Sequence, residues 1–159
     1  MLSTDVRSLK GVESMDWKKE AEMDLRHYNA RKQSLENITA KIAALEEQFK
    51  AIKCTSCDST PVQGGASRLE DNWINNIVQR QRLMHTYKAT KPLVLLVEKG
   101  LSKLTDQQRT ILDAFYINRS YGHVEKLMEQ YHIEQARVYQ LKNIALYQFT
   151  ISMYGILDY

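Results

Sequence analysis

The sequence is poor in residues that make tight turns. Its 159 residues include only 6 Gly and 2 Pro, and no stretch alternates apolar and polar side chains for the length of a β-strand. Gln, Glu, Lys, Leu and Ala are abundant instead, and these residues favour helix. The composition therefore predicts an all-α chain, folded as one domain or as two small ones.

Long apolar runs are also missing. The longest is "PLVLLV", residues 92–97, far shorter than the roughly 20 residues that a membrane-spanning helix needs. The opening stretch "MLSTDVRSLKGVESMDW" lacks the apolar block of a signal peptide. We therefore expect a cytoplasmic protein with no membrane partner.

Signals of catalysis and of cofactor binding are few. There is no phosphate-binding G-x-x-x-x-G-K-[ST] loop, and the histidines are scattered along the chain. Cys54 and Cys57 form a lone C-x-x-C, whereas zinc would need two further ligands. We expect no enzyme activity and no cofactor. Plain reduced cysteines and a zinc ion shared across a dimer both remain open. The histidines are His27, His85, His123 and His132.

The charge is weakly basic and unevenly distributed. The formal net charge is +3, from 22 basic and 19 acidic residues. Residues 1–53 hold 10 basic and 9 acidic residues, residues 54–104 hold 7 and 4, and residues 105–159 hold 5 and 6, giving +1, +3 and −1. Neutralised phosphates supply most of the non-specific affinity for DNA, so the bulk charge of the last segment would not help it bind a polyanion.

After a flexible N-terminus, residues 1–15, the chain should form a long helical hairpin, residues 16–100. We expect its first helix to run from about Asp16 to Lys53 and its loop to cover residues 54–67. Apolar residues follow a heptad pattern along the first helix, which is typical of coiled coils. This seam would pack either against the next helix of the same chain or against a second copy in a homodimer. The seam consists of Leu35, Ile38, Ile42, Leu45, Phe49 and Ile52.

The second helix of the hairpin should begin at a capping box, in which Ser67 and Glu70 satisfy free N–H groups. An apolar stripe should then be buried, and the opposite face, rich in amides and bases, should be solvated. Pro92 should kink this helix or start a new one, because it lacks an N–H group. The stripe consists of Leu69, Trp73, Ile74, Ile77, Val78 and Met84, and the polar face includes Asn72, Asn75, Asn76, Gln79, Arg80, Gln81 and Arg82.

The last third of the chain has the pattern of three short helices. Thr105 and Gln108 form a second capping box, Ser120 is the expected N-cap of the middle helix, and Glu134 is that of the last helix. The connection "YHIE", residues 131–134, is very short. This order, in which a very short turn precedes a final amphipathic helix, is typical of a helix-turn-helix. A generic three-helix bundle has the same pattern.

We assign residues 101–159 to this C-terminal helix-turn-helix domain. Each helix has an apolar face, and the tail "ISMYGILDY" should pack back onto the domain. The apolar faces consist of Ile111, Leu112, Phe115 and Tyr116; of Val124, Leu127, Met128 and Tyr131; and of Ile133, Val138, Leu141, Ala145 and Leu146. The tail would pack through Ile151, Met153, Tyr154 and Ile156.

The C-terminal third also resembles a known family. The stretch "LSKLTDQQRTILDAFYINRSYGHVEKLMEQYHIEQARVYQLKNIALYQF", residues 101–149, resembles the promoter-reading fourth domain of the bacterial sigma-70 type. The similarity lies in the residues that lead into the domain and in the apolar positions of its last helix. Those positions hold Leu101, Leu104, Gln108, Arg109, Ile111, Leu112, Tyr116, Ile133, Val138, Leu141, Ala145 and Leu146.

A closer resemblance covers nearly the whole chain. The stretches "ARKQSLENI", "TPVQGGASR", "NNIVQRQ", "FYINR" and "FTISMYG" are similar to those of small proteins from phages and integrated elements of Gram-positive bacteria. These proteins are described as sigma-like transcriptional regulators of late packaging and lysis genes. The resemblance implies a sequence-specific regulator that binds double-stranded DNA inside a bacterial host cell.

The resemblance also implies which residues of the recognition helix, residues 134–148, contact DNA. Base-contacting positions hold Gln135, Ala136 and Gln140, backbone-contacting positions hold Arg137 and Tyr139, and Lys142 and Asn143 would lie nearer the backbone. The residue types agree with this expectation. Gln can pair with adenine in the major groove, Arg can reach guanine or phosphate, and Ala can touch a thymine methyl group.

Because residues 105–159 carry a net charge of −1, one copy should bind DNA weakly. We therefore expect a homodimer formed through the hairpin, or help from RNA polymerase. Two other functions fit the same features. A small terminase subunit for phage packaging also joins a helix-turn-helix to long helices, and an interaction protein could use the hairpin to bind a host complex.

Overall fold

The computed structural model describes residues 16–56 and 66–155. These residues form five α-helices and one π-helical turn, with no β-strand among them, which confirms the predicted all-α class. The predicted flexible N-terminus lies outside the described residues. The elements in chain order are α1 (Trp17–Ser56), α2 (Ala66–Ser102), α3 (Asp106–Leu112), η1 (Asp113–Ile117), α4 (His123–Tyr131) and α5 (Gln135–Tyr154).

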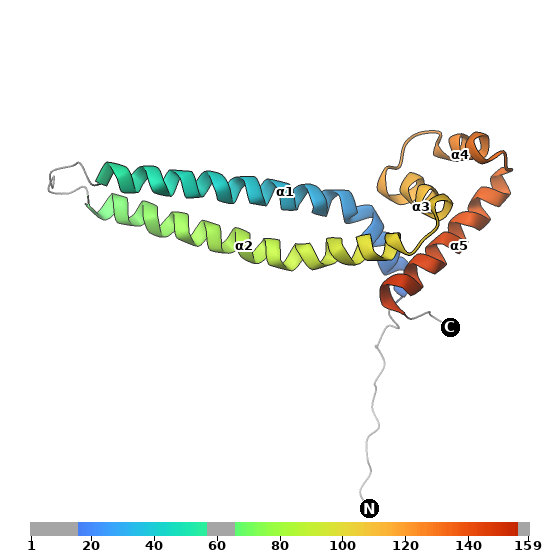
Figure 1. Ribbon diagram of the computed structural model, residues 1–159, viewed down its shortest axis with the longest axis horizontal. Helices are drawn as coiled ribbons and strands as arrows, with labels where there is room; N and C mark the ends of the chain where they lie inside the picture. The colour runs from blue at the N-terminus through green and yellow to red at the C-terminus, as the bar shows by residue number, and fades with distance from the viewer. Residues whose placement is uncertain (1–15, 57–65, 156–159) are drawn as a thin grey trace, which may run out of the picture.

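The long helices α1 and α2 lie side by side as an antiparallel hairpin that extends away from the other helices (Figure 1). The heptad seam of α1 packs against α2 of the same chain. Ile38 and Leu45 are each 8% exposed, and the Phe49 and Trp73 rings lie 6.2 Å apart. Of the two uses expected for the seam, the structure therefore has the intramolecular one.

The buried face of α2 differs from the predicted stripe. Ile74, Ile77 and Met84 are 58%, 38% and 41% exposed, whereas Asn76 is buried. The Asn76 side-chain amide donates to the backbone carbonyl of Leu45 at 2.8 Å. The prediction was wrong because it assigned every polar residue to solvent. A buried amide is tolerated where it finds a backbone acceptor.

The ends and the middle of α2 also correct the expected boundaries. α1 continues to Ser56 and α2 begins at Ala66, so the predicted loop over residues 54–67 is helical at both ends. Ser67 therefore does not precede the helix as an N-cap would. Pro92 does not start a new helix, because α2 continues through it. The Pro92 ring is exposed. Two residues later, the buried side chain of Val94 anchors the helix.

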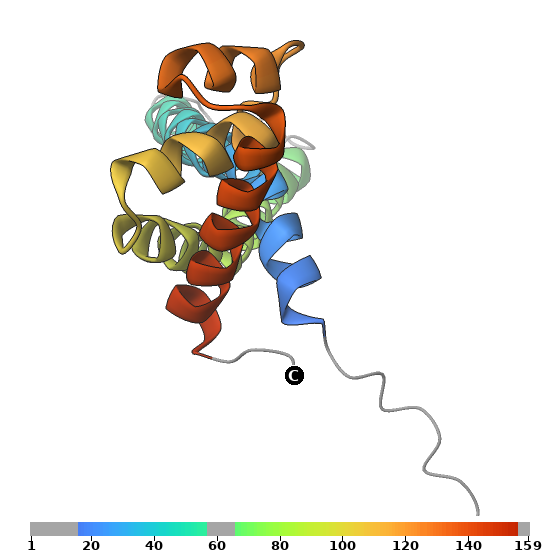
Figure 2. The same cartoon turned by 90° about the vertical axis from the view of Figure 1, so that its right-hand side faces the viewer.

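All the described elements except α4 contribute to one hydrophobic core at the open end of the hairpin (Figure 2). We call the assembly of the start of α1, the end of α2, α3, η1, α4 and α5 the head. The predicted division between residues 100 and 101 falls inside α2, so helices of the hairpin complete the core of the head. Its core residues are Ala21, Leu25, Val97, Leu101, Leu104, Leu112, Tyr116, Ala145, Leu146 and Phe149.

Helices α2 and α5 approach each other closely at Gly100. A Cβ atom on this residue would lie 2.8 Å from side-chain atoms of both Phe149 and Met153. The predicted tail is in part the last turn of α5, in which Met153 and Tyr154 pack against the core. Ile156, the other end of that prediction, lies outside the described residues.

Candidate nucleic-acid interface

The connection between α4 and α5 consists of three residues, 132–134. His132 adopts the left-handed conformation, with φ 52° and ψ 48°, and the Ile133 N–H donates to the Met128 carbonyl at 3.2 Å. This conformation reverses the chain without a glycine, although an L-residue adopts it at some cost. The connection is therefore as short as the sequence predicted.

A second apolar cluster holds α4 and the start of α5 on α3. Ile111, Val124, Leu127 and Val138 are buried in it, with exposures from 0% to 8%. Val138 is in the first turn of α5 and is fully buried, so the rotation of α5 about its axis is set from its beginning. The faces of this helix that point to solvent are determined by that rotation.

The helix caps in the head agree only in part with the sequence. Thr105 and Gln108 form the predicted capping box, with both reciprocal hydrogen bonds present. The N-cap of α4 is Gly122, at φ 69°, and not Ser120, whose carbonyl faces His123 Nδ1 at 3.0 Å. Glu134 occupies the predicted N-cap position of α5, but its carboxylate makes no capping hydrogen bond.

Ala136, Gln140, Asn143 and Tyr147 form an exposed stripe along α5, because residues four, seven and eleven positions apart share one helix face. We call these four residues the α5 stripe. Arg137 lies beside it, and its guanidinium donates to Gln140 Oε1 at 3.1 Å. The structure thus brings four of the seven predicted contact residues together on one solvent-facing surface: Ala136, Arg137, Gln140 and Asn143.

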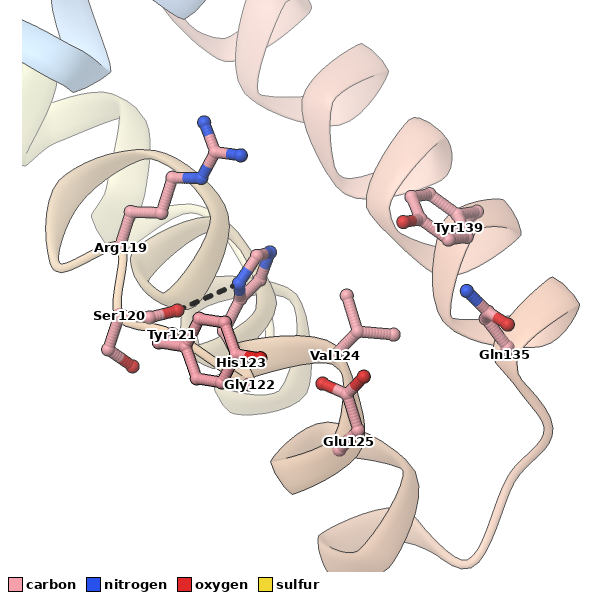
Figure 3. Close-up of a pocket in the computed structure, with 9 residues that line it drawn as sticks. All are labelled: Arg119, Ser120, Tyr121, Gly122, His123, Val124, Glu125, Gln135 and Tyr139. Atoms are coloured by element: carbon pink, nitrogen blue, oxygen red, sulfur yellow. Dashed lines mark hydrogen bonds between the residues drawn. The ribbon is translucent and has the colours of Figure 1, made fainter.

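Gln135 and Tyr139 lie on another side of α5. They line a surface pocket of about 500 Å³, and Figure 3 shows them opposite residues 119–125 of the turn and of α4. The Tyr139 ring meets the Phe115 ring edge-on at 5.7 Å, yet 42% of the residue is exposed. These two side chains can still reach a ligand that covers both α5 and the turn.

Lys142 is the predicted residue that departs most from the expected surface. It is half-buried, and its ammonium group lies 5.9 Å from the centre of the Phe115 ring. The sequence pattern did not predict this position, because the alkyl stem of a lysine can pack along an apolar surface while its charged group stays near solvent.

The sequence also gave no sign that Lys18, at the start of α1, lies beside Asn143 and Tyr147 of α5.

No protein-family model, curated protein or solved structure matches this chain. The sigma-like resemblance therefore stays a prediction. In the part of the chain that the structure describes, no three His, Cys, Asp or Glu side chains are grouped to hold a metal ion. Cys57, the second cysteine of the predicted C-x-x-C, lies outside that part. None of the described helices combines the length and apolarity that a membrane span needs.

Proposed function

We propose that this protein is a sequence-specific DNA-binding transcription regulator of a phage or integrated element, acting in a bacterial cell. In this proposal α4 and α5 work as a helix-turn-helix, and α5 enters the major groove. The observation that carries it is the α5 stripe beside Arg137, held outward by the buried Val138. A short turn, an anchored second helix and an exposed amide-rich face are what such a motif needs.

The residue types of the stripe suit base edges. The amide of Gln140 can both donate to N7 and accept from the amino group of adenine. Ala136 has no side chain that would hold the helix away from the groove, and its methyl group can contact thymine. The hydrogen bond from Arg137 does not block Gln140, because an amide oxygen has two lone pairs and can accept twice.

The test is selection from random-sequence duplex DNA at two salt concentrations, followed by sequencing of the retained fraction. Gln140→Ala is compared with Gln48→Ala, which removes an exposed glutamine from the hairpin. We expect the wild type and Gln48→Ala to enrich the same motif. Gln140→Ala should lose preference at one base pair by roughly 5- to 150-fold, since a bidentate contact contributes about 1–3 kcal/mol of discrimination.

Two results would count against the proposal. One is an unchanged motif in both Gln135→Ala and Gln140→Ala variants with wild-type circular dichroism. The other is retention of DNA without any enriched motif, which would favour the packaging alternative.

A protein partner for the hairpin is a second candidate, favoured by the apolar side chains that α2 exposes. Ile77 and Met84 line a surface pocket with Ile42 of α1, and Ile74 is exposed nearby. A second copy of the chain, RNA polymerase or another host complex would cover these side chains. Light scattering separates the outcomes: a dimer supports the homodimer, a ring of many subunits supports packaging, and a monomer leaves a host protein as the partner.

A further inference from the structure

Lys18 belongs to α1 but lies against the far end of the α5 stripe. A surface pocket of about 470 Å³ is lined by Lys18, Asn143, Ile144, Tyr147 and Gln148. Four of these five side chains carry a hydrogen-bond donor. Figure 2 shows the start of α1 running beside the lower half of α5, and the rings of Trp17 and Tyr154 lie 4.9 Å apart.

The Lys18 ammonium group is available to an anion. The side chain is exposed, and no ion pair within the described residues includes it. Its neighbour Lys19 is paired with Asp16 at 3.1 Å. Glu22, one turn further along α1, is occupied by Arg26 at 3.6 Å and by the hydroxyl of Tyr116 at 3.2 Å.

The start of α1 is held firmly in this place. Ala21 and Leu25 are fully buried in the core of the head. The Tyr154 hydroxyl donates to Asp24 Oδ2 at 2.6 Å, and the other oxygen of Asp24 pairs with Arg31 at 2.6 Å. These contacts connect α1 to the last turn of α5, so Lys18 keeps a constant relation to the stripe.

The length of the α5 stripe places this pocket at the edge of a DNA groove. Ala136 and Tyr147 are eleven residues apart, which is about 16 Å along a helix at 1.5 Å per residue. The major groove is only about 12 Å wide. If Ala136 and Gln140 contact bases, Asn143 and Tyr147 reach the rim of the groove, where the phosphates are.

We propose that Lys18, together with Asn143, Tyr147 and Gln148, binds a phosphate of the DNA backbone that flanks the recognised bases. This inference rests on the proposed DNA-binding function and adds to it a contact from the other end of the chain. The contact would also offset the unfavourable charge of residues 105–159, whose net charge is −1. Lys18, from residues 1–53, adds a positive charge beside α5 that can face a phosphate.

The test compares wild type, Lys18→Gln and the matched control Lys19→Gln, in binding to a duplex with the selected motif and to a scrambled duplex. Affinity is measured between about 50 and 200 mM salt. Lys18→Gln should flatten the slope of log affinity against log salt by about 0.9, so its loss of affinity over this range is about 3.5-fold smaller. It should weaken both duplexes by the same factor. Lys19→Gln should match the wild type.

Each other outcome overturns a defined part of the proposal. A wild-type salt slope in Lys18→Gln, with DNA still bound, removes the phosphate contact and leaves the proposed function standing. A weakening confined to the selected motif would make Lys18 a base contact, which also contradicts it. If the wild type binds neither duplex, both proposals fail. Circular dichroism checks that the variants are folded, which we expect because both lysines are exposed.

Discussion

The head and the outer part of the hairpin are both helical, but they bury side chains to very different extents. The core of the head draws ten buried residues from α1, α2, α3, η1, α5 and the α2–α3 connection. In the outer hairpin, residues 33–52 and 68–90, only Ile38, Leu45 and Asn76 are buried among the described side chains. Two helices alone can cover only one face of each other, whereas crossing helices can enclose a core on several sides.

This difference has a consequence for function. A reading surface needs side chains held within a fraction of an ångström by a packed support, and the head provides it under the α5 stripe. The outer hairpin leaves apolar side chains of α2 exposed, a feature that is common on surfaces that bind a partner. Amide hydrogen exchange should therefore be slowest in α5 and α3 and faster in the outer hairpin.

The largest effect should come from removing matched aromatic rings in the two regions. Phe149 is fully buried in the head, and Phe49 is half-buried in the hairpin against Trp73. Phe149→Ala should lower the free energy of unfolding by about 3–5 kcal/mol, because it leaves a cavity. Phe49→Ala should cost about 1–2 kcal/mol, because part of its ring is already in water. Urea denaturation measures both, and equal costs would refute the contrast.

The close approach at Gly100 offers a second comparison. Alanine is normally preferred to glycine in a helix by about 1 kcal/mol, so Ala89→Gly on the exposed side of α2 should destabilise by that amount. Gly100→Ala should also destabilise, by about 1–2 kcal/mol, because its Cβ would meet Phe149 at 2.8 Å and that ring is enclosed. A stabilised Gly100→Ala variant in thermal denaturation would mean that the helices can separate without cost.

Replacing Asn76 in the hairpin should have a smaller effect on stability, and one of opposite sign. Its amide nitrogen donates to Leu45, but its side-chain oxygen is buried and has no hydrogen-bond partner. Asn76→Leu keeps the branched shape and the number of side-chain heavy atoms and removes the unsatisfied atom, so it should stabilise the hairpin by about 1 kcal/mol. Hydrogen exchange of α1 and α2 would detect this change. Faster exchange in the variant would show that the hydrogen bond to Leu45 outweighs the unpaired oxygen.

The last expected effect is a pH dependence that arises from two tyrosines of the head. Burial, followed by the nearby Glu22 carboxylate, raises the pKa of Tyr116 to about 12. Burial and the hydrogen bond to Asp24 raise the pKa of Tyr154 as well. Because the folded-state pKa is the higher one, this stability is complete below the unfolded pKa of about 10 and is lost as pH rises toward 12.

Tyr116→Phe should therefore show a shallower loss of stability between about pH 10 and 12 than the wild type. Chemical denaturation at a series of pH values measures the free energy of unfolding of both proteins. Their difference near pH 8, where the tyrosine is protonated in both states, is the reference for the differences at higher pH. Parallel curves for the two proteins above pH 10 would mean that this hydroxyl titrates alike in the folded and unfolded chains.

Local chemistry made several parts of the head predictable. The capping box of Thr105 and Gln108 depends on residues three positions apart, and the short connection before α5 depends on where two apolar patterns end. Predictions about the N-cap of α4 and the side chain of Glu134 were wrong, although they used the same kind of reasoning. Several residues near a helix start can satisfy its N–H groups, so a favourable residue type does not select one position.

The sequence by itself determined that the described part of the chain is helical, where α1, α3 and α5 begin, and that the heptad seam of α1 is apolar. These properties follow from spacings of three and four residues, which every helix brings onto one face. Only the tertiary structure decided that α2 buries Asn76 and exposes Ile74, that the ammonium group of Lys142 lies over the Phe115 ring, and that Lys18 lies beside Tyr147. These outcomes depend on packing between segments far apart in the chain, where burial of the whole core outweighs the preference of any one residue.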